Sequence, residues 1–117
     1  MIVPVLRYVD TDAGLRFLVD GLGFDLVGDP ERNDDGTIVH AELRRGDAWV
    51  MLSNTDDQTP SEAYLVDADP DARFEQAIAA GAETMYEPKD QPYGSREFAV
   101  IDPGGTTWYV GTYAPSH

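Results

Sequence analysis

The sequence has no cysteine, a single lysine (Lys89) and no apolar run of the length that crosses a membrane. Without cysteine, the chain forms no disulfide, no thiolate metal site and no cysteine nucleophile. The sequence also shows no positively charged leader followed by an apolar core, so we expect neither export nor membrane insertion. A cytoplasmic location is therefore predicted.

Positive charge is scarce. The chain has 8 basic against 22 acidic residues and a formal net charge of -14. The negative electrostatic potential of such a chain repels phosphate groups, so nucleic acids and anionic membranes are not expected partners. A cationic ligand is attracted. The same charge also suits a solubilising surface for high salt, and both explanations remain open.

One motif occurs twice, first at residue 9 and again at residue 66. The first copy consists of Val9–Asp12 and Arg16–Phe17, and the second of Val66–Asp69 and Arg73–Phe74. Each copy lies between a strand-like run and a helical run that ends in glycine. Two copies predict a pseudo-symmetric pair of modules rather than a solenoid, which needs at least about three repeats. The length suits a single domain.

The first half is predicted to contain a strand, a helix and three further strands. A strand over residues 1–9 precedes a helix capped by Asp12, which ends near Gly21 and Gly23. Its buried face carries four apolar residues at helical spacing: Leu15, Leu18, Val19 and Leu22. Strands over 24–28, 37–44 and 48–53 follow, with a polar stretch over 29–36.

The second half repeats this order after a linker at about 55–60. A strand over 62–66 leads to a helix capped by Asp69, with Pro70 at its first position and Phe74, Ala77 and Ile78 as its buried stripe. Strands over 84–87, 96–101 and 107–113 follow. An α+β fold of two βαβββ modules, at about 1–54 and 61–113, is predicted.

This pattern resembles the vicinal oxygen chelate superfamily, which includes glyoxalase I, extradiol dioxygenases and the fosfomycin- and bleomycin-resistance proteins. The resemblance extends over nearly the whole chain, on Val5–Asp10, Leu22–Phe24, His40–Leu43, Gly46–Asp47, Ala80–Ala82, Pro92–Phe98 and Asp102–Gly105 with Trp108. It implies a pseudo-twofold pair of modules that forms a cup-shaped mixed sheet. The inner strand faces of the cup would hold the metal and the substrate.

The resemblance places the family's usual metal-ligand positions at Val3, Met51, Ala63 and Tyr109. None of these residues binds a divalent metal as His or Glu does, and among their neighbours only Glu62 supplies a carboxylate. The chain therefore resembles the metal-free bleomycin-resistance-like branch most closely. We expect no metal and no cofactor, and we favour a non-enzymatic protein without excluding an enzyme.

His40 and Glu42 lie two apart on a predicted strand, so their side chains share a face. They are candidates for a metal or a shared proton, or they simply face water. A third ligand is missing, because the only other histidine is His117.

Further candidate ligand-binding residues are Trp49, Met51 and Tyr109, which alternation places toward the cup. They line either an open pocket for a flat or apolar molecule or a filled second core. Tyr93 and Arg96 are expected at the mouth of the second module. There Arg96 either clamps an anionic group or pairs with Glu97, Asp90 or Asp102.

Three functions remain open. The first is a homodimer that sequesters a cationic or aromatic compound such as an antibiotic, as in antibiotic resistance of the bleomycin-resistance type. The second is a glyoxalase-like lyase or isomerase or a dioxygenase. It would work with a metal relocated near His40 and Glu42, or without a metal, with Tyr109 as acid, Arg96 as clamp and Glu42 as base. The third is a dimeric scaffold with a filled cup.

Overall fold

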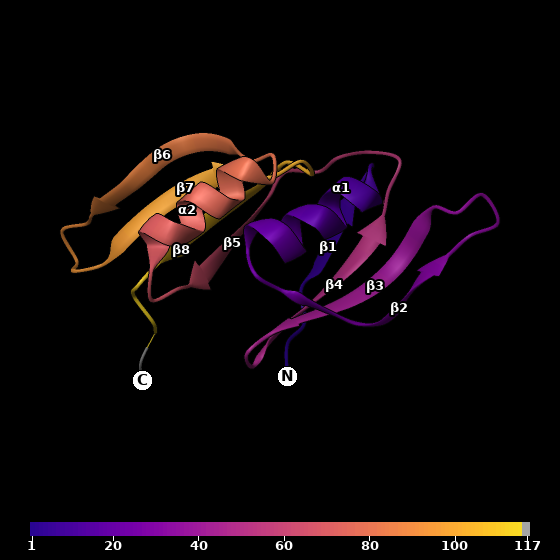
Figure 1. Cartoon of the computed structure of the whole chain (residues 1–117), viewed down its shortest axis with the longest axis horizontal. Coiled ribbons are helices and arrows are strands. Elements are labelled where there is room, and N and C mark those ends of the chain that lie inside the picture. Colours follow the sequence, from indigo (N-terminus) through magenta and orange to yellow (C-terminus); the bar gives the residue numbers. More distant parts are fainter. Residues whose placement is uncertain (116–117) are drawn as a thin grey trace.

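The computed structural model describes residues 1–115 and places two βαβββ modules side by side (Figure 1). Module 1 contains β1 (Val5–Tyr8), α1 (Thr11–Arg16), a π-helical turn η1 (Phe17–Gly21), β2 (Asp25–Arg32), β3 (Ile38–Arg45) and β4 (Ala48–Asn54). Module 2 contains β5 (Ser61–Val66), α2 (Pro70–Ala79), β6 (Glu83–Asp90), β7 (Arg96–Ile101) and β8 (Thr106–Gly111). The predicted α+β fold class is confirmed.

Each module forms its own four-stranded mixed sheet. The strand orders are β1-β4-β3-β2 and β5-β8-β7-β6, with the first strand of each module parallel to its last. The helices cover one face of each sheet and lie on the same side of the molecule (Figure 1). We call the opposite face of each sheet its open face, and the two open faces point the same way.

The helix starts follow from capping, with one correction. The first helix is capped by Asp10, whose Oδ1 accepts a hydrogen bond from the Ala13 amide at 3.0 Å. Asp12, the predicted cap, lies in the first turn instead. The second helix starts as predicted, with Asp69 accepting from the Ala72 amide and Pro70 at the first position.

The predicted buried stripe of the second helix is wrong at Ile78, which is 36% exposed. Ala77 is fully buried and Phe74 packs against the core. The helix turns its small residues toward η1, where a Cβ on Gly21 would lie only 3.1 Å from the Cβ of Ala80. This close helix contact rotates Ile78 toward solvent.

The edge strands β2 and β6 are longer than predicted. They extend over Asp25–Arg32 and Glu83–Asp90, because an edge strand tolerates the turn-type residues Gly28, Pro30 and Pro88. Both strands change register against their neighbours, which marks β-bulges or similar irregularities. Conversely, β1 is shorter than the predicted strand over 1–9.

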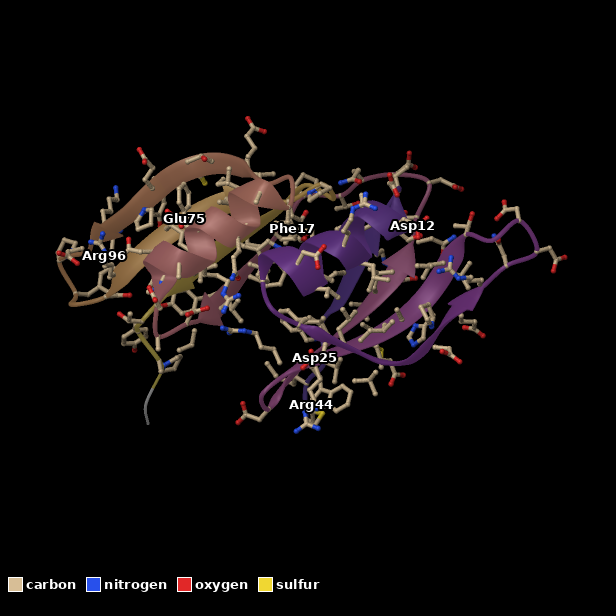
Figure 2. The ribbon with its side chains drawn as sticks, viewed as in Figure 1. Asp12, Phe17, Asp25, Arg44, Glu75 and Arg96 are labelled. Atoms are coloured by element: carbon tan, nitrogen blue, oxygen red, sulfur yellow. The ribbon has the colours of Figure 1, made fainter. Side chains whose placement is uncertain are left out.

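The core lies between the helices and the two sheets and continues from one module to the other. Fully buried Phe17 lies at the seam between the modules (Figure 2). Across the same seam, the Phe24 and Trp108 ring centroids are 6.5 Å apart. Within residues 1–115, no helix is long and apolar enough to cross a membrane.

Candidate ligand-binding site

The open face of module 1 combines an aromatic, an apolar and several charged side chains. The β3–β4 register pairs His40 with Ser53, Glu42 with Met51 and Arg44 with Trp49, so these six side chains share one face. The intervening residues, including Leu43 and Leu52, are fully buried beneath the helix. Strand alternation thus brings together the four candidate ligand-binding residues of this module: His40, Glu42, Trp49 and Met51.

His40 and Glu42 contact each other at the middle of this face. The Nε2 of His40 lies 3.4 Å from the Oε2 of Glu42, and both side chains are partly exposed. In the part of the chain that the structure describes, no three His, Asp or Glu side chains gather as a metal site would require. His117 lies outside the described residues. The contact is a hydrogen-bonded pair at a solvent-accessible face.

Trp49 is half-buried at the end of the β3–β4 hairpin. The Arg44 guanidinium lies 5.8 Å from the centroid of its ring, and the Arg44 Nε donates to the Gly46 carbonyl at 2.7 Å. Figure 2 shows Arg44 at this hairpin, away from the helices. The cation–π contact and the hydrogen bond both restrain Arg44 at the indole.

A pocket of about 240 Å³ lies between the modules next to Trp49. Its wall is mostly apolar and includes Leu6, Phe24, Trp49, Tyr64 and Trp108, with Asp47 as an acidic residue. Trp49 and Tyr64 belong to the open faces of the two sheets, whereas Leu6, Phe24 and Trp108 belong to the core. The pocket thus lies at the seam between the modules and is bordered by one aromatic residue of each open face. Its volume is just below the range of about 300–1,000 Å³ that is typical of small-molecule sites.

Of the positions that the resemblance assigned to metal ligands, Ala63 was wrongly placed. Ala63 pairs with buried Trp108 and packs against the core, whereas its neighbours Glu62 and Tyr64 lie on the open face. A shift of one residue moves a strand side chain to the other face of the sheet. Met51 and Tyr109 do lie on open faces, and Val3 precedes β1.

The open face of module 2 is built around Glu97 on β7. Only 5% of this residue is exposed, and its carboxylate accepts hydrogen bonds from two phenols. Tyr93 donates to Oε1 at 2.7 Å and Tyr86 donates to Oε2. We define the tyrosine cluster as the four phenols of this face: Tyr64, Tyr86, Tyr93 and Tyr109.

The hydrogen bonds to Glu97 keep both phenols protonated. Burial, followed by the bond to Glu97, raises the pKa of Tyr86 above its usual range. The same carboxylate raises the pKa of Tyr93 to about 12, chiefly through its hydrogen bond. Within residues 1–115, no Lys, Arg or His nitrogen lies within 4.0 Å of the Glu97 carboxylate. Glu97 is thus a buried acid held by neutral donors.

Arg96 is occupied by acidic partners. Its Nε and Nη2 donate to the two carboxylate oxygens of Asp71 at 2.8 and 3.0 Å, and its Nη1 donates to Asp90 at 3.3 Å. Of the two alternatives, pairing with Asp90 is therefore seen, and the guanidinium fork is not free for an anion. Figure 2 shows Arg96 at the outer end of module 2, where it ties β7 to α2.

A family model for the Glyoxalase/Bleomycin resistance protein/Dioxygenase superfamily matches residues 2–110. The chain belongs to this superfamily. Among solved structures it is similar to TioX from Micromonospora sp. ML1, at 30% identity and a TM-score of 0.83 over 97% of this chain and 98% of TioX. It is also similar to the bleomycin-binding protein of Streptomyces verticillus, solved in complex with copper(II)-bleomycin. The identity is 33% and the TM-score 0.60 over 93% of this chain and 92% of that protein.

The chain is also similar to an uncharacterized protein of Mycobacterium bovis. It is 34% identical over 91 residues, which cover 66% of this chain and 60% of that protein. The chain thus spans about 60% of the length of this curated relative.

Glu97, Tyr86 and Tyr64 were not recognised from the sequence as site residues. A signal was present, since five of the six tyrosines, all except Tyr8, follow residue 60. Tyr109 pairs with Ala99 on the neighbouring strand, and Glu97 lies two residues before Ala99, so all three side chains are on the same face. The hydrogen bond from Tyr86 depends on the irregular β6–β7 register, which periodicity does not reveal.

Proposed function

We propose that this superfamily member binds a small organic molecule, cationic or aromatic and of the antibiotic type, and releases it unchanged. The observation that carries the proposal is the pocket between the modules, which is bordered by Trp49 of module 1 and Tyr64 of module 2. Aromatic side chains at a concave site bind flat or apolar molecules through large contact areas. The net charge of -14 favours a cationic guest.

The similarity to the bleomycin-binding protein of Streptomyces verticillus supports this proposal. That protein is 33% identical to this chain and is described in complex with copper(II)-bleomycin. We extend only the class of function, sequestration of a drug-like compound, to this chain. Copper(II)-bleomycin is therefore the first compound to test.

A homodimer belongs to the same proposal. The two open faces point away from the helices and expose several large apolar side chains, including Val5, Val27, Tyr64 and Val66. Pairing about a twofold axis would cover these faces and enclose a ligand between two copies. We expect a solution mass of twice 12.9 kDa by analytical ultracentrifugation at micromolar concentration. A monomer at that concentration would contradict the dimer.

Calorimetric titration tests the binding proposal. The titrants are copper(II)-bleomycin and a panel of cationic and neutral aromatic compounds, and the proteins are the wild type, Trp49→Ala and Ile78→Ala. Ile78 is a matched control, because it is a partly exposed apolar residue on the helix-covered side.

We expect a compound that binds the wild type and Ile78→Ala equally and binds Trp49→Ala at least about tenfold more weakly. The proposal fails if no compound binds, or if Trp49→Ala binds as tightly as the wild type.

A further inference from the structure

We propose that Glu97 and the tyrosine cluster form a subsite for an alkylammonium group, either a protonated amine or a quaternary ammonium. The inference rests on the proposed function and deepens it by naming the chemical group of the ligand that module 2 recognises. The subsite is distinct from the apolar pocket between the modules, whose lining includes Tyr64 but not Glu97.

The first argument is the state of the Glu97 carboxylate. A buried carboxylate is normally paired with a cation, because neutral hydrogen bonds compensate only part of its lost hydration. Glu97 is 5% exposed and accepts only phenol hydrogen bonds from Tyr86 and Tyr93 among its side-chain contacts in residues 1–115. A carboxylate has about four acceptor positions, so it retains capacity for a donor or a cation.

The second argument is the ring surface around this charge. Aromatic faces attract ammonium groups, and a cage of several rings is the usual recognition site for quaternary ammonium. The ammonium of Lys89 already lies 4.6 Å from the centroid of the Tyr86 ring. Lys89 and Glu97 are also cross-strand neighbours. The Lys89 ammonium thus lies against the Tyr86 ring, whose hydroxyl donates to Glu97.

The third argument is access. The floor beneath the cluster is made of small residues, buried Ala99 on β7 and Gly111 on β8. A Cβ on Gly111 would lie 2.7 Å from the Tyr64 hydroxyl, so glycine is needed for that phenol to rest on the sheet. Tyr93 follows the end of β6 and is 59% exposed. Within residues 1–115, its hydroxyl is the one side-chain donor on Oε1, and its movement would open that oxygen to a ligand.

The test titrates the protein with two probes, choline and its uncharged carbon analogue dimethylbutanol. Binding is monitored through the amide chemical shifts of the protein in solution. The full-length proteins are the wild type, Glu97→Gln, Glu62→Gln and Tyr93→Phe. Glu62→Gln is the matched control, because it removes the same charge from the same open face on β5. A neutral dye, N-phenylnaphthylamine, is titrated in parallel to report on apolar binding alone.

We expect choline to shift amides near Glu97 and Gly111, and dimethylbutanol to leave them unchanged. Binding should weaken at least about tenfold in Glu97→Gln and stay unchanged in Glu62→Gln. Tyr93→Phe should bind choline more tightly, because its ring remains while Oε1 becomes free. This opposite sign separates recognition at Glu97 from a general loss of structure.

Equal binding of the two probes, or full choline affinity in Glu97→Gln, would overturn the subsite. Weaker choline binding by Tyr93→Phe would also overturn it. If the dye binds and choline does not, the subsite is wrong while the proposed function stands. If neither binds, the subsite is wrong, and the calorimetric titration with copper(II)-bleomycin and the panel decides the proposed function separately.

Discussion

The hydroxyl of Tyr8 donates to Oδ2 of Asp102 at 2.7 Å and thereby joins β1 of module 1 to the β7–β8 turn of module 2. Asp102 is 5% exposed and also accepts from the Trp108 indole at 2.9 Å and from the amides of Gly104 and Thr106. The carboxylate therefore organises its own turn and the contact between the modules. Burial, followed by the adjacent Asp102 charge, raises the pKa of Tyr8 well above its usual range.

Replacing Tyr8 with phenylalanine should destabilise the protein by about 1–3 kcal/mol, because a buried carboxylate loses one of its donors. The free energy of unfolding from urea denaturation measures this effect. Tyr113→Phe is the control, since Tyr113 is 49% exposed. Equal stability of the two variants would show that the bond contributes nothing to the contact between the modules.

Asp67 provides a second link between the modules and predicts a pH dependence. It accepts from Arg45 Nη2 at 2.6 Å, Arg73 Nε at 2.8 Å and the Asp69 amide at 2.8 Å. Burial opposes its ionisation, but the Asp69 amide and the two guanidinium groups outweigh burial and lower its pKa. Its contribution to stability is thus present above the unfolded pKa and is lost as the pH falls through the lower folded pKa.

Asp67→Asn should therefore lower stability by about 2–3 kcal/mol at neutral pH and by less in acid near pH 3. Denaturant unfolding at both pH values measures the two differences, with exposed Asp34→Asn as the control. A loss of stability that is the same at both pH values would refute the assigned role of the Asp67 charge.

Glu97 should be visible in the titration of the tyrosines. Glu97 raises the pKa of Tyr93 to about 12, and burial together with Glu97 raises the pKa of Tyr86, so both phenols should ionise at higher pH than an ordinary tyrosine. In Glu97→Gln, two tyrosines should move back toward the usual pKa of about 10. Tyrosinate absorbance against pH measures this shift. Unchanged curves would contradict the hydrogen bonds to Glu97.

The sequence was sufficient for the fold because the repeat, the caps and the strand alternation agree with one another. It placed Trp49, Met51 and Tyr109 on open faces, since alternation depends only on local geometry. Distant pairing could not be predicted. The sequence left a clamp and an acidic pair open for Arg96 and did not name Asp71, and it did not show that Tyr86 reaches Glu97 across an irregular register. Ala63 was misplaced by one residue, which reverses the face of a strand.

The pair of His40 and Glu42 is expected to hold no metal by itself, because two ligands are fewer than the three or so that a protein site supplies. After equilibration with zinc, nickel, cobalt, iron and manganese and subsequent desalting, we expect less than stoichiometric metal by elemental analysis. Stoichiometric metal that is lost in His40→Ala would instead support an enzyme with a relocated metal centre.

Binding without chemical conversion is tested most directly by equilibrium dialysis against copper(II)-bleomycin and the cationic and aromatic panel, followed by mass spectrometry of the released compound. We predict that at least one compound concentrates with the protein and leaves with its mass unchanged. Retention of no compound, or release of a compound with an altered mass, would contradict the account.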